Sequence, residues 1–502
     1  MTQPILTATD YHRVTSYRRH QLTPHTLDWA HQPMPVKRYP DLPRVPLDRS
    51  VKLPAIDYFD LMNRLQAVES SGPGAPDRQT LTTAFRLTHD ITARAMHAGT
   101  PFYYRSVASA GALYPFEIYL AVHHLDGMDP GVYHFDLFDF CLTTLRHGSV
   151  PEIPPVDRTV SATFYISGIF FRSAWKYRNR AYRYVLLDAG HLLENLRLAL
   201  DALHQCFSIH LDFDDERVGT LLGLDPQREA CLACVHLHDD HAGAKAPGEA
   251  DPLIPLSADI LQASRVSEQE VAYGDILSVH RSGNGNGSPS AGALTALHVL
   301  GSQPSPWVDL NVPDHPGSAD YSRVLRQRRS RRNFIAAPVS QDRFMAFADL
   351  MASHMGRASS MPTACRSAIS LGLVVGAGMP MPPGFYLLDP NAKQLGRVSD
   401  GRLSESMAAA CLDQMWLKHA ALHLLFMTDP AALDRRWGPR GYRYAMIESG
   451  RLGQQAYLAA TALGWGACGI GAIYDREAAE LLDLAADGAL LYLVGAGPVK
   501  TR

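Results

Sequence analysis

The sequence predicts an α+β protein built from two copies of one unit, which pack about a pseudo-twofold axis within a single chain. Three observations lead to this prediction. The chain has 502 residues, 46% of them hydrophobic and 19% charged, which is enough for two large or about three ordinary domains. A stretch of the first half recurs in the second half. A region rich in Gly, Pro and Ser separates the two halves.

The repeat is clearest over residues 181–203. When this stretch is shifted by 260 positions it aligns with residues 441–463, and nine of its 23 positions are then identical. Apolar residues recur there with the period of a wide-faced helix, so each copy is predicted to be a long, mostly buried helix. An upstream strand repeats as well, as Gly131–Asp136 and Gly384–Asp389. Two copies of one fold are expected to pack as the subunits of a dimer do.

Composition sets the expected boundaries. Residues 242–318 contain Gly/Pro/Ser-rich stretches without sustained periodicity, which predicts a linker interrupted by a short helix near Ala258–Glu270. Residues 51–241 are then the first unit and residues 319–502 the second. Residues 1–50 form an N-terminal arm.

Charge and cysteine usage exclude several classes of protein. The 47 basic and 50 acidic side chains give a net charge of −3, which argues against a nucleic-acid binder. The sequence shows neither the apolar core of a signal peptide nor a membrane-spanning apolar stretch of about 18–20 residues. The seven cysteines are scattered, as reduced thiols usually are. We therefore expect a cytoplasmic protein without a nucleic-acid or membrane partner.

One group of cysteines and histidines raises the question of a metal. The pair Cys231 and Cys234 is followed by His236, His238, Asp239, Asp240 and His241, and such residues can hold zinc. A second ligand pair at zinc-finger spacing is missing, and Ala230–His238 also fits a buried strand ending in a polar turn. The strand is the favoured interpretation, and we expect no metal site.

A basic run in the second half carries the first family resemblance. Residues 321–334 are predicted to form a short helix that leads into Arg328–Arg332. Most such runs are solvated helix faces, but Arg-x-Ser-x-Arg also combines forked donors with a hydroxyl, which suits a phosphate monoester. This stretch resembles the flavin-phosphate motif of the nitroreductase-like FMN enzymes, and residues 464–502 resemble the closing strand and basic C-terminus of that family.

This resemblance implies the architecture of each unit, a central antiparallel or mixed sheet flanked by helices. It also implies FMN as the cofactor. By the same resemblance, the phosphate and ribityl chain are bound by Arg328, Ser330, Arg332, Lys500 and Arg502, and the flavin ring lies beside Ile470 and Gly471.

A second motif lies in the first half, at residues 105–117. Its plain interpretation is a turn of small residues before a strand. However, Ser109–Pro115, with the sequence Ser-Ala-Gly-Ala-Leu-Tyr-Pro, resembles a signature of the SagB/ThcOx-type dehydrogenases, which use flavin to oxidise azolines to azoles. The resemblance implies that a ring-facing loop borders the flavin and that its residues are Ser109, Ala110, Gly111, Ala112 and Leu113.

The two motifs stand in different halves of the chain. The phosphate motif occurs only in the second half. The ring-facing loop is intact only in the first half, because its counterpart at Pro362–Ala368 has lost the pattern. Nitroreductase-type FMN sites lie at a dimer interface, so the resemblance implies one composite FMN site per chain, built from both halves.

The same resemblance implies the catalytic pair. In SagB/ThcOx-type enzymes a Lys-Tyr pair serves as the base, and Lys176 and Tyr177 precede the first long helix. The equivalent positions in the second half hold Arg436 and Trp437, and arginine stays protonated. We expect burial and the neighbouring arginines at positions 172, 178 and 180 to make Lys176 a better base. The alternative is that Lys176 lies in a surface patch or binds a substrate carboxylate.

Three further side chains of the long helix are interpreted as structural. Tyr182 and Tyr184 occur in both copies, so packing explains them better than catalysis. His191 is equivalent to Arg451 in the second copy, and we interpret it as structural too.

The leading functional hypothesis is an FMN-dependent dehydrogenase or oxidase that acts on an azoline or a related C–N heterocycle in peptide natural-product tailoring. The alternatives are an NAD(P)H-dependent nitro- or ene-type reductase and a flavin-less scaffold of a biosynthetic complex. The SagB/ThcOx-type enzymes that act on ribosomal peptides often carry an N-terminal peptide-clamp module of about the size of a domain. The 50 residues before the first unit are too few for such a module, so recognition of a leader peptide is not implied. A free, carrier-bound or peptide-bound heterocycle is therefore the expected substrate, with a peptide synthetase or cyclodehydratase as the expected kind of partner.

Overall fold

Two seven-stranded sheets organise the protein. The computed structural model describes residues 7–22, 25–64, 76–97, 99–239, 253–284, 299–310, 317–356 and 361–500. The strand order is β1-β6-β5-β4-β7-β9-β8 in the first sheet and β10-β13-β12-β11-β14-β16-β15 in the second. Every pairing within both sheets is antiparallel. The two orders correspond strand for strand, which confirms the predicted α+β fold of two like units.

The first sheet takes its edge strand β1 from the expected N-terminal arm and its other strands from the first unit, which also contains a separate hairpin. The sheet strands are β1 (Arg44–Pro46), β4 (Phe116–Val122), β5 (Gly131–Asp136), β6 (Cys141–His147), β7 (Val160–Ile169), β8 (Phe207–His210) and β9 (Glu229–His238). The hairpin strands are β2 (Ile91–His97) and β3 (Thr100–Arg105). The helices up to the second sheet are α1 (Ala8–Val14), α2 (Tyr58–Arg64), α3 (Arg78–Thr88), α4 (Phe170–Tyr177), α5 (Ala181–Ala202), α6 (Asp215–Leu222), α7 (Ala258–Gln262) and α8 (Gly274–Ser282).

The second unit follows the same plan. Its strands are β10 (Trp307–Asp309), β11 (Ser370–Val375), β12 (Gly384–Asp389), β13 (Gln394–Asp400), β14 (Leu422–Thr428), β15 (Gly466–Ile470) and β16 (Ala489–Gly497). Its helices are α9 (Tyr321–Gln327), α10 (Gln341–Gly356), α11 (Thr363–Arg366), α12 (Ser404–Ala410), α13 (Pro430–Trp437), α14 (Arg440–Ala462) and α15 (Asp475–Leu481).

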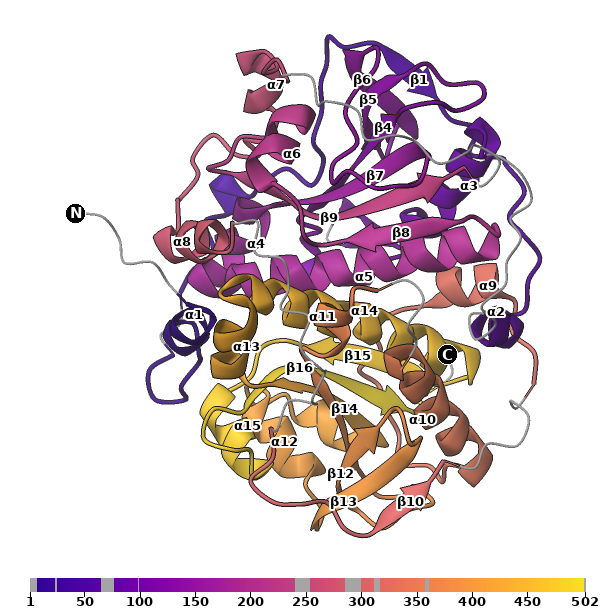
Figure 1. Ribbon diagram of the computed structural model, residues 1–502. Helices are drawn as coiled ribbons and strands as arrows, with labels where there is room; N and C mark the ends of the chain where they lie inside the picture. Colours follow the sequence, from indigo (N-terminus) through magenta and orange to yellow (C-terminus); the bar gives the residue numbers. More distant parts are fainter. Residues whose placement is uncertain are drawn as a thin grey trace.

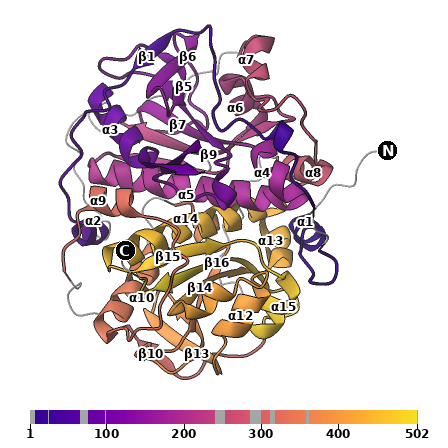
Figure 2. The same ribbon diagram turned by 180° about the vertical axis from the view of Figure 1, so that it is seen from behind.

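The two long helices of the repeat, α5 and α14, lie side by side between the sheets (Figures 1 and 2). All residues of 181–200 and 440–460 are buried. The close approach requires glycine: a Cβ added to Gly190 would lie 2.1 Å from the Ile447 carbonyl oxygen, and one added to Gly450 would lie 2.1 Å from the Leu187 carbonyl oxygen. Gly190 and Gly450 are 260 positions apart, so the repeat places both at one crossing.

Two buried ion clusters join the units on either side of the pseudo-axis. Asp475 binds Arg180 and Arg183, each with an N–O distance of 2.7 Å. The equivalent Asp215 binds Arg440 at 2.8 Å and Arg443 at 3.0 Å. Burial alone would raise the pKa of Asp475, but the two guanidinium groups hold that pKa below its ordinary value. Removing one partner from such a cluster leaves a buried, unpaired charge.

The expected arm and linker contain equivalent helices. Helix α1 packs against α13 of the second unit, and α8 packs beside the segment between α4 and α5 of the first. His12 of α1 has Nδ1 3.2 Å from the Tyr442 hydroxyl, and His280 of α8 has Nδ1 3.1 Å from the Tyr182 hydroxyl. The structure therefore differs from a plain linker with one short helix, since the range 242–318 contains α7, α8 and the edge strand β10. Such short elements carry too few residues to show a hydrophobic period.

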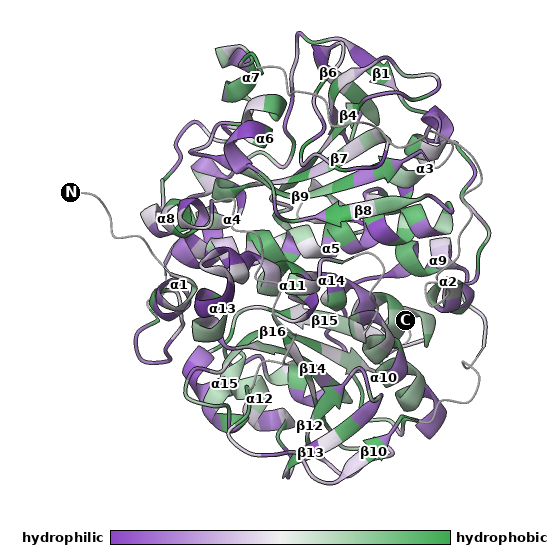
Figure 3. Ribbon diagram, viewed as in Figure 1, coloured by the Kyte–Doolittle hydropathy of each residue, from purple (hydrophilic) through white to green (hydrophobic). Residues whose placement is uncertain are grey.

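Hydrophobic residues gather on the strands that face α5 and α14, whereas α1 and α13 are largely hydrophilic (Figure 3). The expected strand at Ala230–His238 is β9, which is buried along its length. Among the described residues, no helix combines the length and the apolar character needed to cross a membrane.

The glycine crossing predicts a stability effect. Replacing Gly190 or Gly450 by alanine puts a methyl group against a backbone carbonyl, and we expect a loss of roughly 1–3 kcal/mol or more in the free energy of unfolding. Gly219→Ala is the matched control, because Gly219 lies within α6 and a Cβ there meets no atom within 4 Å. We expect it to be neutral or to stabilise by up to about 1 kcal/mol. Urea unfolding measures all three, and equal stability would contradict the proposed crossing.

Candidate functional site

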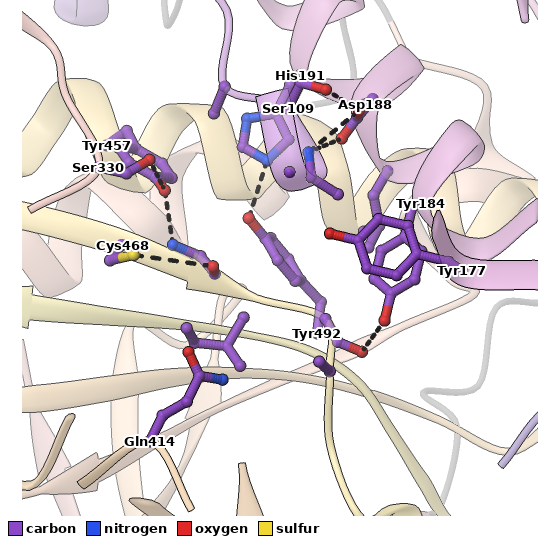
Figure 4. A pocket seen from close by; sticks show the side chains of 18 of the residues that line it. Ser109, Tyr177, Tyr184, Asp188, His191, Ser330, Gln414, Tyr457, Cys468 and Tyr492 are labelled. Atoms are coloured by element: carbon purple, nitrogen blue, oxygen red, sulfur yellow. Dashed lines mark hydrogen bonds between the residues drawn. The ribbon is translucent and has the colours of Figure 1, made fainter. Parts of the chain in front are cut away.

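A pocket lies where the two units meet, and both units form its wall (Figure 4). The first unit contributes the ring-facing loop, the end of α4 and one face of α5. These residues are Ala108, Ser109, Ala110, Gly111, Tyr177, Tyr184, Leu187, Asp188 and His191. The second unit contributes Ser330, Arg332, Gln414, Tyr457, Cys468, Gly469, Ile470, Gly471, Ala472 and Tyr492.

The ring-facing loop is fastened to α5 by hydrogen bonds. Ser109 Oγ donates to Asp188 Oδ2 at 2.5 Å, and the Ala110 amide donates to Asp188 Oδ1 at 3.1 Å. Ser109 Oγ also accepts from the Tyr114 amide at 2.8 Å. Gly111 has a φ of 63°, and a Cβ there would lie 2.9 Å from the Tyr177 hydroxyl. Glycine therefore serves this turn both by its conformation and by the space it leaves.

Asp188 is a buried carboxyl at the pocket wall, 3% exposed. None of the ion pairs found among the described residues includes it. Burial raises the pKa of Asp188 to about 7, although the hydrogen bonds from Ser109 and Ala110 act in the opposite direction. The equivalent residue in the second unit, Glu448, is instead paired with Arg451 at 2.6 Å.

A chain of hydrogen bonds runs from the unit interface to the pocket. Gln454 Nε2 donates to Asn195 Oδ1 at 2.8 Å, which leaves Gln454 Oε1 to accept from His191 Nδ1 at 2.9 Å. His191 Nε2 can then accept from the Tyr492 hydroxyl at 3.1 Å. Burial lowers the pKa of His191 to about 4, so the imidazole is neutral at neutral pH and fits this direction of the chain.

The opposite wall consists of bare backbone at the end of β15. A Cβ added to Gly469 would lie 1.8 Å from the Tyr492 hydroxyl, and one added to Gly471 would lie 2.6 Å from Tyr184 Cε1. The Tyr457 hydroxyl accepts from the Gly469 amide at 2.6 Å and lies 3.0 Å from Ser330 Oγ. Glycine at these two positions therefore lets the side chains of Tyr492 and Tyr184 pack directly against the backbone of this wall.

The structure brings eight of the fourteen sequence-predicted site residues into this pocket. They are Ser109, Ala110, Gly111, Tyr177, Ser330, Arg332, Ile470 and Gly471. Both units contribute residues to this pocket.

Arg328, expected at the phosphate, has a different place. Its side chain is buried and donates to the carbonyl oxygens of Ser106 at 2.9 Å and Arg105 at 2.8 Å. These bonds fasten the second unit to the base of the ring-facing loop. Arg328 therefore supports the loop from behind and does not line the pocket.

Three other predicted residues also lie away from the pocket wall. Ala112 packs against the main core, and Leu113 packs against a smaller apolar cluster with Trp175. Lys500 is exposed, and its backbone pairs with that of Asn333. Arg502 lies outside the described residues.

Lys176 lies beside the pocket at the end of α4. Its Nζ is 5.5 Å from the centre of the Tyr177 ring and would be 3.3 Å from a Cβ at Gly111. Two of the arginines expected to act on it are engaged elsewhere: Arg172 and Arg180 bind carboxylates at 2.6 and 2.7 Å. The expected cluster of positive charge around Lys176 is therefore largely neutralised by these ion pairs.

Sequence reasoning missed several residues of the pocket. Tyr184 and His191 were expected to be structural but line it, and Asp188 was not considered. The sequence held a signal for these residues. Asp188 and His191 are equivalent to Glu448 and Arg451 in the repeat, so the two copies differ at a pair of polar positions.

The described residues contain no group of three or more His, Cys, Asp or Glu arranged to hold a metal ion. Cys231 and Cys234 are buried within β9. Asp240 and His241, which were weighed with them, lie outside the described residues.

Comparison with known proteins now decides the family of the second unit. Residues 325–497 match the model of the nitroreductase family. The second unit is a nitroreductase-family domain. The first unit repeats its strand order and long helix, so the two units share one fold.

Two curated relatives and one solved structure extend this finding. A candidate nitroreductase of Methanocaldococcus jannaschii is 35% identical over 112 residues, which are 22% of this chain and 57% of the relative. The trifolitoxin-processing protein TfxB of Rhizobium leguminosarum bv. trifolii is 32% identical over 153 residues, which are 27% of this chain and 40% of the relative. A candidate nitroreductase from Anabaena variabilis has the same fold over 98% of this chain and 99% of its own, with a TM-score of 0.76 and 24% identity.

Neutral, buried His191 predicts a pH effect on stability. Its folded-state pKa lies below the unfolded value near 6.5, so the unfolded chain binds the extra proton and stability falls as pH drops from about 6.5 toward 4. His191→Gln removes this titration. Between about pH 6.5 and 4.5, we expect the variant to lose roughly 2 kcal/mol less unfolding free energy than the wild type. Urea unfolding at both pH values measures this, and equal losses would show that His191 is protonated in the fold.

Proposed function

We propose that this chain is an FMN-dependent oxidoreductase with one composite FMN site, built from both units. The observation that carries this proposal is the pocket wall itself. The ring-facing loop of the first unit and the glycine wall of β15 in the second border one cavity, with Ser330 and Arg332 on the same wall. No single unit holds both parts.

The residues present fit FMN. Ser330 offers a hydroxyl, and Arg332 is exposed, with no ion pair to it among the described residues, so its forked donors can bind a phosphate. Gly469 and Gly471 line the same pocket, together with the aromatic rings of Tyr184 and Tyr492 that pack against them, and such a wall suits a flat flavin ring. When bound, FMN would supply a two-electron acceptor that takes a hydride from the substrate.

A residue of the chain must then accept the proton that the substrate loses. Aromatising an azoline removes one hydride and one proton, and the proton needs a protein base. We assign this role to Lys176, whose Nζ lies beside the ring-facing loop, with Tyr177 positioning it. Burial, together with Tyr184 and Asp188, raises the pKa of Tyr177, so the phenol keeps its proton and can act as a hydrogen-bond donor.

The equivalent place on the other side of the pseudo-axis is filled. Where the second unit has Gly469 and Gly471, the first has Ile209 and Leu211, both buried. The guanidinium of Arg451 binds Glu448 at 2.6 Å and Glu194 at 3.2 Å. Because large side chains and a buried ion cluster stand at these positions, we propose no second flavin site there.

The peptide-tailoring substrate class rests on two observations from sequence. The ring-facing loop and the Lys-Tyr pair resemble the SagB/ThcOx-type dehydrogenases, and the trifolitoxin-processing protein is among the relatives. We therefore propose an azoline or related C–N heterocycle as substrate. As partner we propose a peptide synthetase or cyclodehydratase that makes this heterocycle.

Flavin stoichiometry tests the composite site. We expect purified protein, loaded with FMN, to release one FMN per chain. Gly471→Val should abolish binding because its side chain collides with Tyr184 and displaces that ring of the pocket wall, whereas Gly219→Ala, which meets no atom within 4 Å, should bind as the wild type does. Release of two FMN per chain, or unchanged binding by Gly471→Val, would contradict the proposal.

Substrate-dependent bleaching tests the reaction. In anaerobic mixing, a model azoline should bleach the flavin and NADPH should not; rapid bleaching by NADPH alone would favour the reductase alternative. Lys176→Ala should keep FMN but slow bleaching by roughly 10²–10⁴-fold, as loss of a general base does. Arg436→Ala, at the repeat equivalent of Lys176, is the matched control and should bleach at the wild-type rate. Full activity of Lys176→Ala would remove Lys176 from the mechanism.

A further inference from the structure

Asp188 accepts hydrogen bonds from two donors of the ring-facing loop, and these bonds favour its ionised form. Oδ2 accepts from Ser109 Oγ and Oδ1 accepts from the Ala110 amide. Ser109 Oγ already accepts from the Tyr114 amide, so its hydrogen is directed to the carboxylate. When the carboxyl is protonated, its own hydrogen competes with these donors for the same oxygen atoms. Either the loop then moves away or the Ser109 hydroxyl turns and its hydrogen bond to Asp188 is lost.

The surroundings of the carboxyl oppose this ionised form. The groups that line the pocket around Asp188 are Tyr177 from α4, Tyr184 and His191 from α5, and Tyr457 and Tyr492 from the second unit. His191 is neutral, because burial lowers its pKa to about 4. The cations nearest to the pocket are Arg332 on its wall, Lys176 beside the loop and Arg328 behind it, and none of the ion pairs among the described residues joins one of them to Asp188. A buried carboxylate without a cation is costly.

We propose that Asp188 is the positioning residue of the ring-facing loop and that it holds or releases this loop as its carboxyl loses or gains a proton. The loop is held when two donors meet a carboxylate and is released when the carboxyl is protonated. Burial raises the pKa of Asp188 to about 7, which puts the change within reach of ordinary buffers. The consequence for FMN, tighter binding to the held loop, rests on the proposed function.

Amide exchange reads the loop directly, without flavin. The Ala110 amide binds Asp188 and the Tyr114 amide binds Ser109. In flavin-free, full-length protein we expect both amides, after correction for intrinsic rates, to be protected about tenfold more at about pH 8.5 than at about pH 5.5, as the loss of a hydrogen bond would give. The midpoint should lie near pH 7. Protection that does not change with pH would overturn the proposal.

Three variants separate positioning from general stability. Asp188→Asn keeps the shape but cannot ionise, so protection should no longer depend on pH. Ser109→Ala removes a hydrogen bond that favours the ionised form, so the midpoint should move to higher pH. Asp136→Asn is the matched control: Asp136 is also buried and accepts backbone amides, from Phe138 at 2.9 Å and Asp139 at 3.0 Å, but lies away from the pocket. In Asp136→Asn, the protection of the Ala110 and Tyr114 amides should depend on pH as it does in the wild type.

Two of these outcomes overturn the assignment. One is an Asp188→Asn profile that still follows the wild-type midpoint. The other is an unmoved midpoint in Ser109→Ala, which decides the question even if Asp188→Asn fails to fold. FMN titration of the same proteins distinguishes a failure of the Asp188 proposal from a failure of the proposed FMN site. Tighter FMN binding at about pH 8.5 in the wild type, with no pH dependence in Asp188→Asn, supports both, whereas titrating amides in a protein that binds no FMN would contradict the proposed function alone.

Discussion

The close crossing of α5 and α14 is the constraint on which the rest of the structure depends. The two helices touch through Gly190 and Gly450, where backbone meets backbone and a single methyl group would collide with a carbonyl oxygen. This contact sets the separation of the two sheets. It also brings one face of α5, with Asp188 and His191, against the β15 wall of the other unit. The ion clusters of Asp215 and Asp475 then fix the rotation of one unit against the other.

A duplicated chain can change one copy of a site while the other copy keeps its chemistry. The two sides of the pseudo-axis show this at equivalent positions of the repeat. Gly469 and Gly471 are equivalent to Ile209 and Leu211. Asp188, which has no ion pair among the described residues, is equivalent to Glu448, which is bound to Arg451. On one side the glycines let the rings of Tyr492 and Tyr184 pack against the backbone, and the carboxyl of Asp188 has no ion pair among the described residues. On the other side the space is filled and the charges are neutralised. The asymmetry follows from a few substitutions on a shared backbone.

Much of this could be predicted from the sequence, because the repeat is long and strongly periodic. The long helices, the two-unit architecture and the meeting of the ring-facing loop with Ser330 and Arg332 were all expected. The structure departs from expectation where tertiary contacts decide. Arg328 belongs to a matching motif, yet it binds backbone carbonyls of the other unit. Tyr184 recurs in both copies, yet it lines the pocket. The roles of such residues depend on what the other unit places opposite them.

The central claim is that one site is assembled from both units, and a crystal structure of the protein with FMN tests it most directly. The account predicts flavin density at one place in each chain, between the loop at Ser109–Gly111 and the backbone at Gly469–Gly471. Density on the opposite side of the pseudo-axis, beside Ile209 and Leu211, or at both places, would contradict it.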